Sequence, residues 1–366
     1  FSLSPLICPS PPPIPPLLTQ QNPIIMKLRS FKNLLLGLMI LSFPLALKAQ
    51  NLQSASPEKS KQEKRKAEIE KIIEISEQHI CNLNWLDSPE WKTFKNELQK
   101  PELLDLDLLA FKKRFRELAR PLPFTHFYLI VKQKSTGAKK AAPPAFAWKA
   151  IDQKTALLTI RSFIADGPAM YNITQEIQAQ GFENLIIDLR ENGGGSLDAA
   201  VVLGQYLTQK PIDAGYYLTR QWFEASRALP TLEEVQGFPY LKEMTLSGFR
   251  KIAKEEAAFR MVIPGHERPI FEGPVYVLIN SNTASTCEAF IALLQEIKRA
   301  KLVGATTDGA MLSGNYHPIH EKLTLFLPEA DYLTAQGNRI DKVGVQPDIK
   351  VRSEEALEYT LEHLIK

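Results

Sequence analysis

The chain has 366 residues, of which 44% are hydrophobic and 23% are charged, as is typical of a globular protein. Its formal net charge of +3 gives no reason to expect binding to nucleic acid or to an anionic membrane surface. The length is enough for one large domain and a smaller one.

The N-terminal fifty residues are expected to be a targeting segment and not part of the fold. From Met26 the sequence reads MKLRSFKNLLLGLMILSFPLALKAQ, in which three basic residues precede an apolar run. This pattern predicts a secretory signal peptide at 26–49, cleaved near Ala49, and an uncleaved N-terminal anchor is the alternative. Residues 1–25 are rich in proline, and we expect them to lie upstream of the true start. The mature protein would then be periplasmic or secreted, with no stable membrane span.

Helical periodicity dominates the next seventy residues. Apolar residues recur at helical spacing in the ranges 58–77, 83–98 and 103–118, and Pro121 ends the pattern. We interpret 50–120 as a small helical N-terminal domain that shields one side of an active site or holds a partner.

Strands and helices alternate from Phe124 onward. Strands are expected at 127–132, 156–163, 185–189, 275–279 and 302–303, and helices at 170–179, 197–207 and 287–297. A hairpin is expected from 323–327 and 332–335, and a final helix from Glu354. The region 221–270 breaks this rhythm and is interpreted as a partly helical insertion over one face. The alternation predicts an α/β fold with a largely parallel core in residues 121–366.

The cysteines and histidines give no sign of a metal site. Cys8 lies in the N-terminal segment, so the mature chain can form at most one disulfide, Cys81–Cys287. Two separate buried thiols are the favoured interpretation. The six histidines are scattered without zinc-ligand spacing, and no metal or cofactor is predicted.

Two segments suggest acyl-transfer chemistry. TASTCEAFIALLQ places Ser285 at the start of an amphipathic helix, and IIDLRENGGG places three glycines, Gly193, Gly194 and Gly195, directly after an apolar strand. A nucleophile on one loop and amide groups exposed on another are two parts of such a site. The alternative for Ser285 is an ordinary helix N-cap.

Four segments in order carry a family resemblance: NLIIDLRENGGGSLDAAVVLGQYL, GPVYVLINSNTASTCEAFIALLQ, RAKLVGATTDG and VGVQPDIKV. Together they resemble the tail-specific, or C-terminal processing, serine peptidases, whose core is similar to the crotonase and Clp-protease folds. The resemblance implies that Ser285 is the nucleophile. It also implies an oxyanion hole from a glycine amide of 193–195 and the amide of Thr286. The chain has no room for the PDZ domain that is usual in the family.

One departure concerns the general base. Many family members carry a catalytic lysine after the TTDG-like turn, where this chain has Ala310. The tricorn-like branch also lacks that lysine and uses a histidine soon after the N-terminal segment, which His126 in FTHFYL resembles. That branch also uses a late carboxylate, which Asp341 resembles, although aspartate is one methylene shorter than the glutamate expected there. His317 is the reserve candidate for the base.

These residues predict a secreted or periplasmic serine endopeptidase that cleaves unfolded polypeptides or peptides through an acyl-enzyme. Ser285 would attack, His126 would act as base, and Asp341 would orient the imidazole. The alternative is an inactive peptidase fold that binds peptides or small apolar ligands, and Ala310 is the feature in its favour. Local packing for His126 and a turn cap or ion pair for Asp341 are the structural alternatives. A thiol nucleophile at Cys287 is a minor one.

Overall fold

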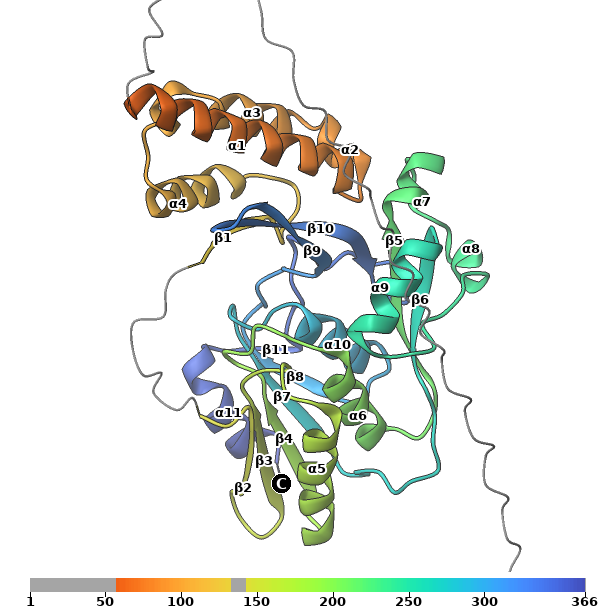
Figure 1. Ribbon diagram of the computed structural model, residues 1–366. Helices are drawn as coiled ribbons and strands as arrows, with labels where there is room; N and C mark the ends of the chain where they lie inside the picture. Colours follow the sequence, from red (N-terminus) through yellow and green to blue (C-terminus); the bar gives the residue numbers. More distant parts are fainter. Residues whose placement is uncertain (1–56, 133–142, 366) are drawn as a thin grey trace, which may run out of the picture. The chain divides into compact units, whose positions relative to one another are not determined.

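The parallel core predicted from the sequence is present in the computed structural model, which describes residues 57–132 and 143–365 (Figure 1). The leader expected at 26–49, the segment 1–25 and Cys8 lie outside the described residues. Among the described helices, none is both long enough and apolar enough to span a bilayer.

Within the described residues, this core is a six-stranded sheet in which all neighbouring strands are parallel except β2 and β3. Its strand order is β11 (Ile349–Lys350), β8 (Lys301–Gly304), β7 (Val275–Ile279), β4 (Asn184–Asp188), β3 (Thr155–Ile160) and β2 (Phe146–Ala150).

Helices cover this sheet on both faces, as its apolar central strands require. On one face Leu185 and Ile187 pack with α5 (Gly167–Gln180), α6 (Leu197–Leu207) and α10 (Thr286–Glu296). On the other, Ile186 packs with α11 (Ala356–His363). Side chains alternate along β4, so both of its faces are buried and its C-terminal end is held firmly.

A second, five-stranded sheet forms in the described residues from antiparallel pairs. Its strands are β1 (Tyr128–Val131), β5 (Ile212–Thr219), β6 (Ala258–Ile263), β9 (Leu312–His320) and β10 (Leu323–Leu333).

The hairpin predicted from 323–327 and 332–335 is wrong, because the first segment and the first two residues of the second belong to the single strand β10. The true hairpin joins β9 to β10. Pro328 lies inside β10, at a register shift between Pro328 and Ala330 where a bulge tolerates proline.

The N-terminal helices pack on this second sheet and share its core. They are α1 (Pro57–His79), α2 (Leu83–Asp87), α3 (Pro89–Leu98), the 3₁₀ turn η1 (Pro101–Leu103) and α4 (Leu108–Ala119). Trp91 and Phe115 contact the Phe127 ring, and Leu323 and Leu325 of β10 belong to the same buried cluster. The helical region therefore fixes the position of the segment that leads into β1.

The region 221–270 contains helices, as predicted, and also a strand that the sequence interpretation missed. It comprises α7 (Arg220–Ala225), α8 (Leu232–Gln236), α9 (Leu246–Glu255) and then β6. Phe249 of α9 packs on Tyr217 of β5 and Phe259 of β6. Because β6 pairs with β5, this region is part of the second sheet.

The two described cysteines, Cys81 and Cys287, are separate buried thiols. This confirms the favoured interpretation and excludes the alternative disulfide.

Candidate active site

Two loops meet where β4 and β7 end. The strands are parallel neighbours, so the loops 189–195 and 280–285 leave the same edge of the sheet. The Ala284 N–H donates to the Asn192 carbonyl (3.0 Å), and the Thr283 hydroxyl donates to the Leu189 carbonyl (2.9 Å). These bonds join the glycine turn to the loop that carries Ser285.

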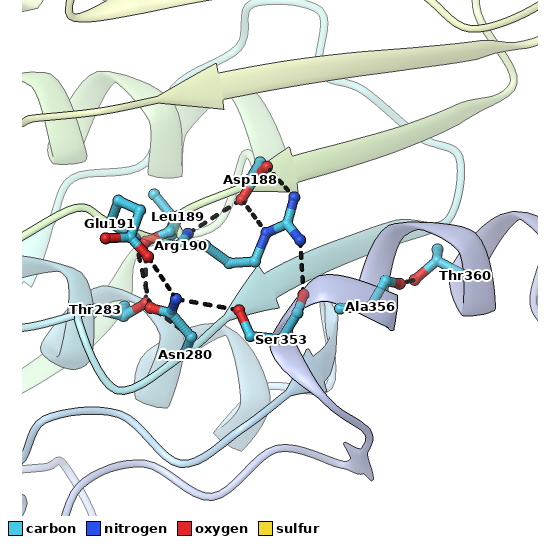
Figure 2. A network of polar contacts seen from close by, with 9 residues as sticks. All are labelled: Asp188, Leu189, Arg190, Glu191, Asn280, Thr283, Ser353, Ala356 and Thr360. Atoms are coloured by element: carbon cyan, nitrogen blue, oxygen red, sulfur yellow. Dashed lines mark hydrogen bonds and ion pairs between the residues drawn. The ribbon is translucent and has the colours of Figure 1, made fainter.

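A polar network braces the glycine turn from outside (Figure 2). Arg190 pairs with Asp188 (Nη2–Oδ2 2.7 Å) and donates to the Ser353 carbonyl (2.7 Å). Asn280 donates to Glu191 (2.8 Å) and to the Ser353 hydroxyl (3.1 Å). Asp188 and Arg190 thus have structural partners, and the network ties the turn to the 3₁₀ turn η2 (Ser353–Glu355) before α11.

Ser285 has a strained backbone at the entry to α10. Its φ of 59° and ψ of −126° are uncommon for a residue with a side chain. A Cβ added to Gly194 would lie 2.7 Å from the Ser285 Cβ, so only glycine permits the approach of the two loops. Strain of this kind concentrates at functional sites, and the same strand–turn–helix placement exposes nucleophilic serines in other hydrolases.

The four amides predicted to bind an oxyanion are not equivalent. The Gly194 N–H donates to Asn192 Oδ1 (2.9 Å), so this amide is engaged and is not a free donor. Gly193 and Gly195 are exposed, and Thr286 is the first residue of α10, where N–H groups lack helical acceptors. The Thr286 hydroxyl donates to the Gly195 carbonyl (2.9 Å), which holds the two segments together.

Glu288, which the sequence interpretation did not select, is a buried carboxylate beneath Ser285. Its Oε2 accepts from the N–H groups of Ser285 and Ala310 (2.9 Å each). Its Oε1 accepts from the Thr307 hydroxyl (2.5 Å) and the Gly309 N–H (2.7 Å). Burial raises the pKa of Glu288, and these donors oppose the rise. The signal was present in the sequence, because Ser285 and Glu288 have the Ser-x-x-Glu spacing of a capping box.

His126 and Asp341 are connected through Thr125. The Thr125 hydroxyl donates to Asp341 Oδ1 and lies 2.9 Å from His126 Nδ1. The N–H groups of Thr125 (3.0 Å) and Met311 (3.1 Å) also donate to this carboxylate. Because the hydroxyl proton points to Asp341, its oxygen accepts from Nδ1–H, and the Nε2 lone pair is left available as a base.

Burial shifts the two titratable groups in opposite directions. It lowers the pKa of His126 to about 4, so the imidazole is neutral at physiological pH. It raises the pKa of Asp341 to about 6, although the hydrogen bonds from Thr125 and Met311 act against the rise. The φ of His126 is 57°, so both the candidate base and the candidate nucleophile have positive φ.

A pocket of about 690 Å³ opens beside His126. Ala310, at the position of the family lysine, lines it together with His126 and Tyr128. The N–H groups of Ala310 and Ser285 both donate to the same oxygen, Oε2 of Glu288. In the part of the chain that the structure describes, no hydrogen bond joins the Ser285 hydroxyl to His126.

The reserve base, His317, lies on the opposite face of the second sheet from His126. His317 pairs in register with Leu325, a core residue beneath the helices, and so points to the same side. His126 packs against Phe326, whose side chain alternates to the other face. His317 is therefore separated from His126 by the second sheet and is engaged by Glu329 (2.8 Å).

Cys287 is fully buried, and burial raises the pKa of its thiol. A thiolate nucleophile there is disfavoured.

Comparison with known proteins finds relatives among carboxyl-terminal processing proteases. The carboxyl-terminal-processing protease of Synechocystis sp. is 28% identical over 173 residues, which cover 47% of this chain and 32% of that protein. Carboxy-terminal processing protease CtpA of Bacillus subtilis is 26% identical over 174 residues, which cover 48% and 30%. The matched segment spans about a third of the length of these curated relatives.

Solved structures share the fold at low identity. The photosystem II D1 C-terminal processing protease aligns with a TM-score of 0.50 at 13% identity, covering 79% of this chain and 94% of that one. A lipoprotein from Streptococcus agalactiae aligns with a TM-score of 0.51 at 14% identity, covering 81% and 94%. The model for peptidase family S41 matches residues 154–351, more than half of the sequence, and the chain belongs to this family.

Proposed function

We propose that this chain is a serine endopeptidase that uses His126, in place of a lysine, as its general base. The observation that carries the proposal is the hydrogen-bonded chain Asp341–Thr125–His126, which leaves Nε2 of a neutral imidazole free. A buried acid and a neutral base joined through a hydroxyl have no evident purpose in packing alone. General-base assistance of this kind contributes roughly 10²–10⁴-fold in rate.

In the first step, Ser285 Oγ attacks the scissile carbonyl carbon and its proton passes to His126 Nε2. The imidazolium then carries a proton on each nitrogen. Its Nδ1–H donates to Thr125, whose hydroxyl donates to the Asp341 carboxylate, so the new positive charge is stabilised across the relay. The Ser285 hydroxyl and His126 must approach to about 2.6–3.2 Å, and such contacts often tighten only when substrate is bound.

The negative charge of the tetrahedral intermediate is stabilised by backbone amides. Thr286 N–H supplies one donor, and Gly193 or Gly195 supplies the second, since Gly194 is engaged by Asn192. Collapse expels the amine, which takes the proton from His126, and leaves an acyl group on Ser285. Water activated by the same imidazole then hydrolyses the acyl-enzyme.

Membership of the family supports a proposal for the substrate class. Relatives named carboxyl-terminal-processing proteases act on polypeptide ends, and we propose unfolded chains or peptide tails as substrates here. The signal-like sequence from Met26 supports action in the periplasm or outside the cell. N-terminal sequencing of the native protein would test both the leader and the start site.

The decisive experiment compares the parent with Ser285→Ala and His126→Ala in unfolded-casein hydrolysis and in labelling by a fluorophosphonate. The proposal expects labelling of the parent at Ser285 and loss of hydrolysis to background in both variants. Loss in Ser285→Ala alone would keep the nucleophile and reject His126 as base. A parent that neither cuts nor labels would favour the alternative, a peptidase fold that has become a binding protein.

A further inference from the structure

A second cluster of metal-ligating side chains lies away from the proposed site. His79 ends α1, His317 lies in β9 and Glu329 in β10, and their ligand atoms all lie within 4.8 Å of one another. Glu329 Oε1 is 2.8 Å from His317 Nε2 and 3.6 Å from His79 Nδ1. The two imidazole centroids are 4.5 Å apart. Sequence spacing does not predict this group, because His79 is more than two hundred residues from its partners.

The backbone aims Glu329 at the two histidines. The register shift between Pro328 and Ala330 leaves Glu329 as the extra residue of a β-bulge, a device that redirects a side chain. The Cys81 N–H donates to the Pro328 carbonyl (3.1 Å), which ties the end of α1 to the bulge. Asn315 donates to Glu329 Oε2 (3.0 Å) and fixes the carboxylate while Oε1 faces the histidines. Ligands oriented in this way are typical of metal sites.

We propose that His79, His317 and Glu329 bind a transition-metal ion, with Zn²⁺ as the best fit to two imidazoles and one carboxylate. Bonds of about 2.0–2.2 Å in a tetrahedral site place ligand atoms about 3.4 Å apart. The two distances from Glu329 Oε1 lie on either side of this value, so small rotamer shifts accommodate the ion.

The fourth position faces a pocket of about 360 Å³ that His79, Asn315 and Glu329 help to line. It leaves room for water or for a small anion. Arg220 also borders this pocket, but its guanidinium is paired with Glu224 (2.9 Å) and donates to the Ile80 carbonyl (3.0 Å). This cation is thus held by other partners and does not take the place of a metal ion.

The ligand atoms of the three residues face one another closely enough to share one ion. Neutral imidazoles and an ionised carboxylate are the forms that ligate metals. When the ion binds, the proton on His317 Nε2 moves to Nδ1 or to solvent. The bound ion then fastens the last turn of α1 to the β9–β10 hairpin.

The test is zinc titration of the untagged protein by calorimetry, with Co²⁺ absorption to report tetrahedral ligation. The parent is expected to bind one equivalent, and His317→Gln and Glu329→Gln to bind roughly 100-fold more weakly or worse. Zinc is expected to raise the Tm of the parent by mass action but not that of the two variants. These readouts do not depend on peptidase activity.

A matched control lies on the same strand. His320 contacts Glu68 (3.2 Å), a histidine–carboxylate pair that the described residues do not extend to a third ligand. His320→Gln should bind zinc like the parent. His79→Gln, at a half-exposed helix end, serves as a further ligand variant if His317→Gln fails to fold. Absence of zinc binding by the parent, or equal binding by the ligand variants, would overturn the proposal.

Discussion

The hydroxyl of Thr125 donates a hydrogen bond to Oδ1 of Asp341, and the Thr125 hydroxyl oxygen lies 2.9 Å from His126 Nδ1. The acid and base that the sequence paired directly are thus joined through a third side chain. Aspartate is one methylene shorter than glutamate, and the threonine hydroxyl bridges the gap. The relay also fixes the tautomer of His126, because the hydroxyl has only one proton to donate.

Removal of the Thr125 hydroxyl should impair His126 as a base without leaving a cavity beside it. Thr125→Val keeps the shape but leaves His126 Nδ1 and Asp341 without their shared partner. We expect kcat to fall about 10²-fold with little change in KM. Thr125→Ser keeps the hydroxyl and should retain most of the activity. Steady-state peptide hydrolysis checks both, and equal losses in the two variants would show that packing, not the relay, was disturbed.

The pH dependence of kcat/KM should reflect ionisation of the Asp341 carboxyl group and not of the His126 imidazole. His126 is neutral above about pH 4, whereas Asp341 becomes ionised only above about pH 6. If activity needs both a neutral imidazole and a carboxylate, kcat/KM should rise with pH through an apparent pKa near 6, which belongs to the coupled relay. Asp341→Asn should lower the plateau and remove that step. A step that stays in place in Asp341→Asn would belong to another group.

The local parts of the site were predictable, and the long-range parts were not. Ser285 and the three glycines follow apolar strands, so their meeting at one sheet edge follows from the alternation of strands and helices. Thr125 was visible beside His126, but its role depends on Asp341, which is 216 residues away. The engagement of Gly194 by Asn192 depends on side-chain orientation, which periodicity does not give.

The strands of the fold can likewise be divided into those that the sequence predicts and those that it does not. Strands buried on both faces, such as β4 and β7, were located because they are short apolar runs. β5 and β9 were missed because polar or small residues, such as Gly215 and Asn315, interrupt their apolar pattern. The sequence interpretation divided β10 into two segments, whereas the strand is continuous and a bulge admits Pro328, which a regular inner strand would exclude.

Substitution by alanine should destabilise the protein far more at Gly194 than at its neighbour Gly193. A Cβ added at Gly194 would lie 2.7 Å from the Ser285 Cβ and 2.9 Å from the Ala284 carbonyl, on a backbone with φ of 95°. We expect Gly194→Ala to lose about 2–4 kcal/mol of unfolding free energy and most activity. Gly193→Ala meets no atom within 4 Å and should be close to the parent in stability. Thermal unfolding and fluorophosphonate labelling test the pair, and similar losses in both would contradict the close approach inferred here.

Glu288 should hold the two halves of the site together. Its carboxylate accepts four hydrogen bonds, two on each oxygen. Glu288→Gln presents an amide N–H₂ to groups that are themselves donors, and we expect a loss of about 2–4 kcal/mol in urea unfolding. Glu296→Gln, at the half-buried end of the same helix, is the control and should change stability little. Equal effects would mean that charge on α10, and not these bonds, is responsible.

Position 310 offers a test of whether a lysine can replace His126 as the general base. The Ala310 side chain lines the pocket that contains His126, while its N–H shares the Glu288 carboxylate with Ser285. A lysine there extends an amine from the position of the family base. In a His126→Ala background, Ala310→Lys should therefore restore activity by about tenfold, a small part of the usual gain from a general base. Asp308→Lys adds the same group at an exposed position of the same pocket, where no such gain is expected. Recovery in both variants would reflect charge in the pocket, and recovery in neither would show that the relay and the lysine require different placements of the nucleophile.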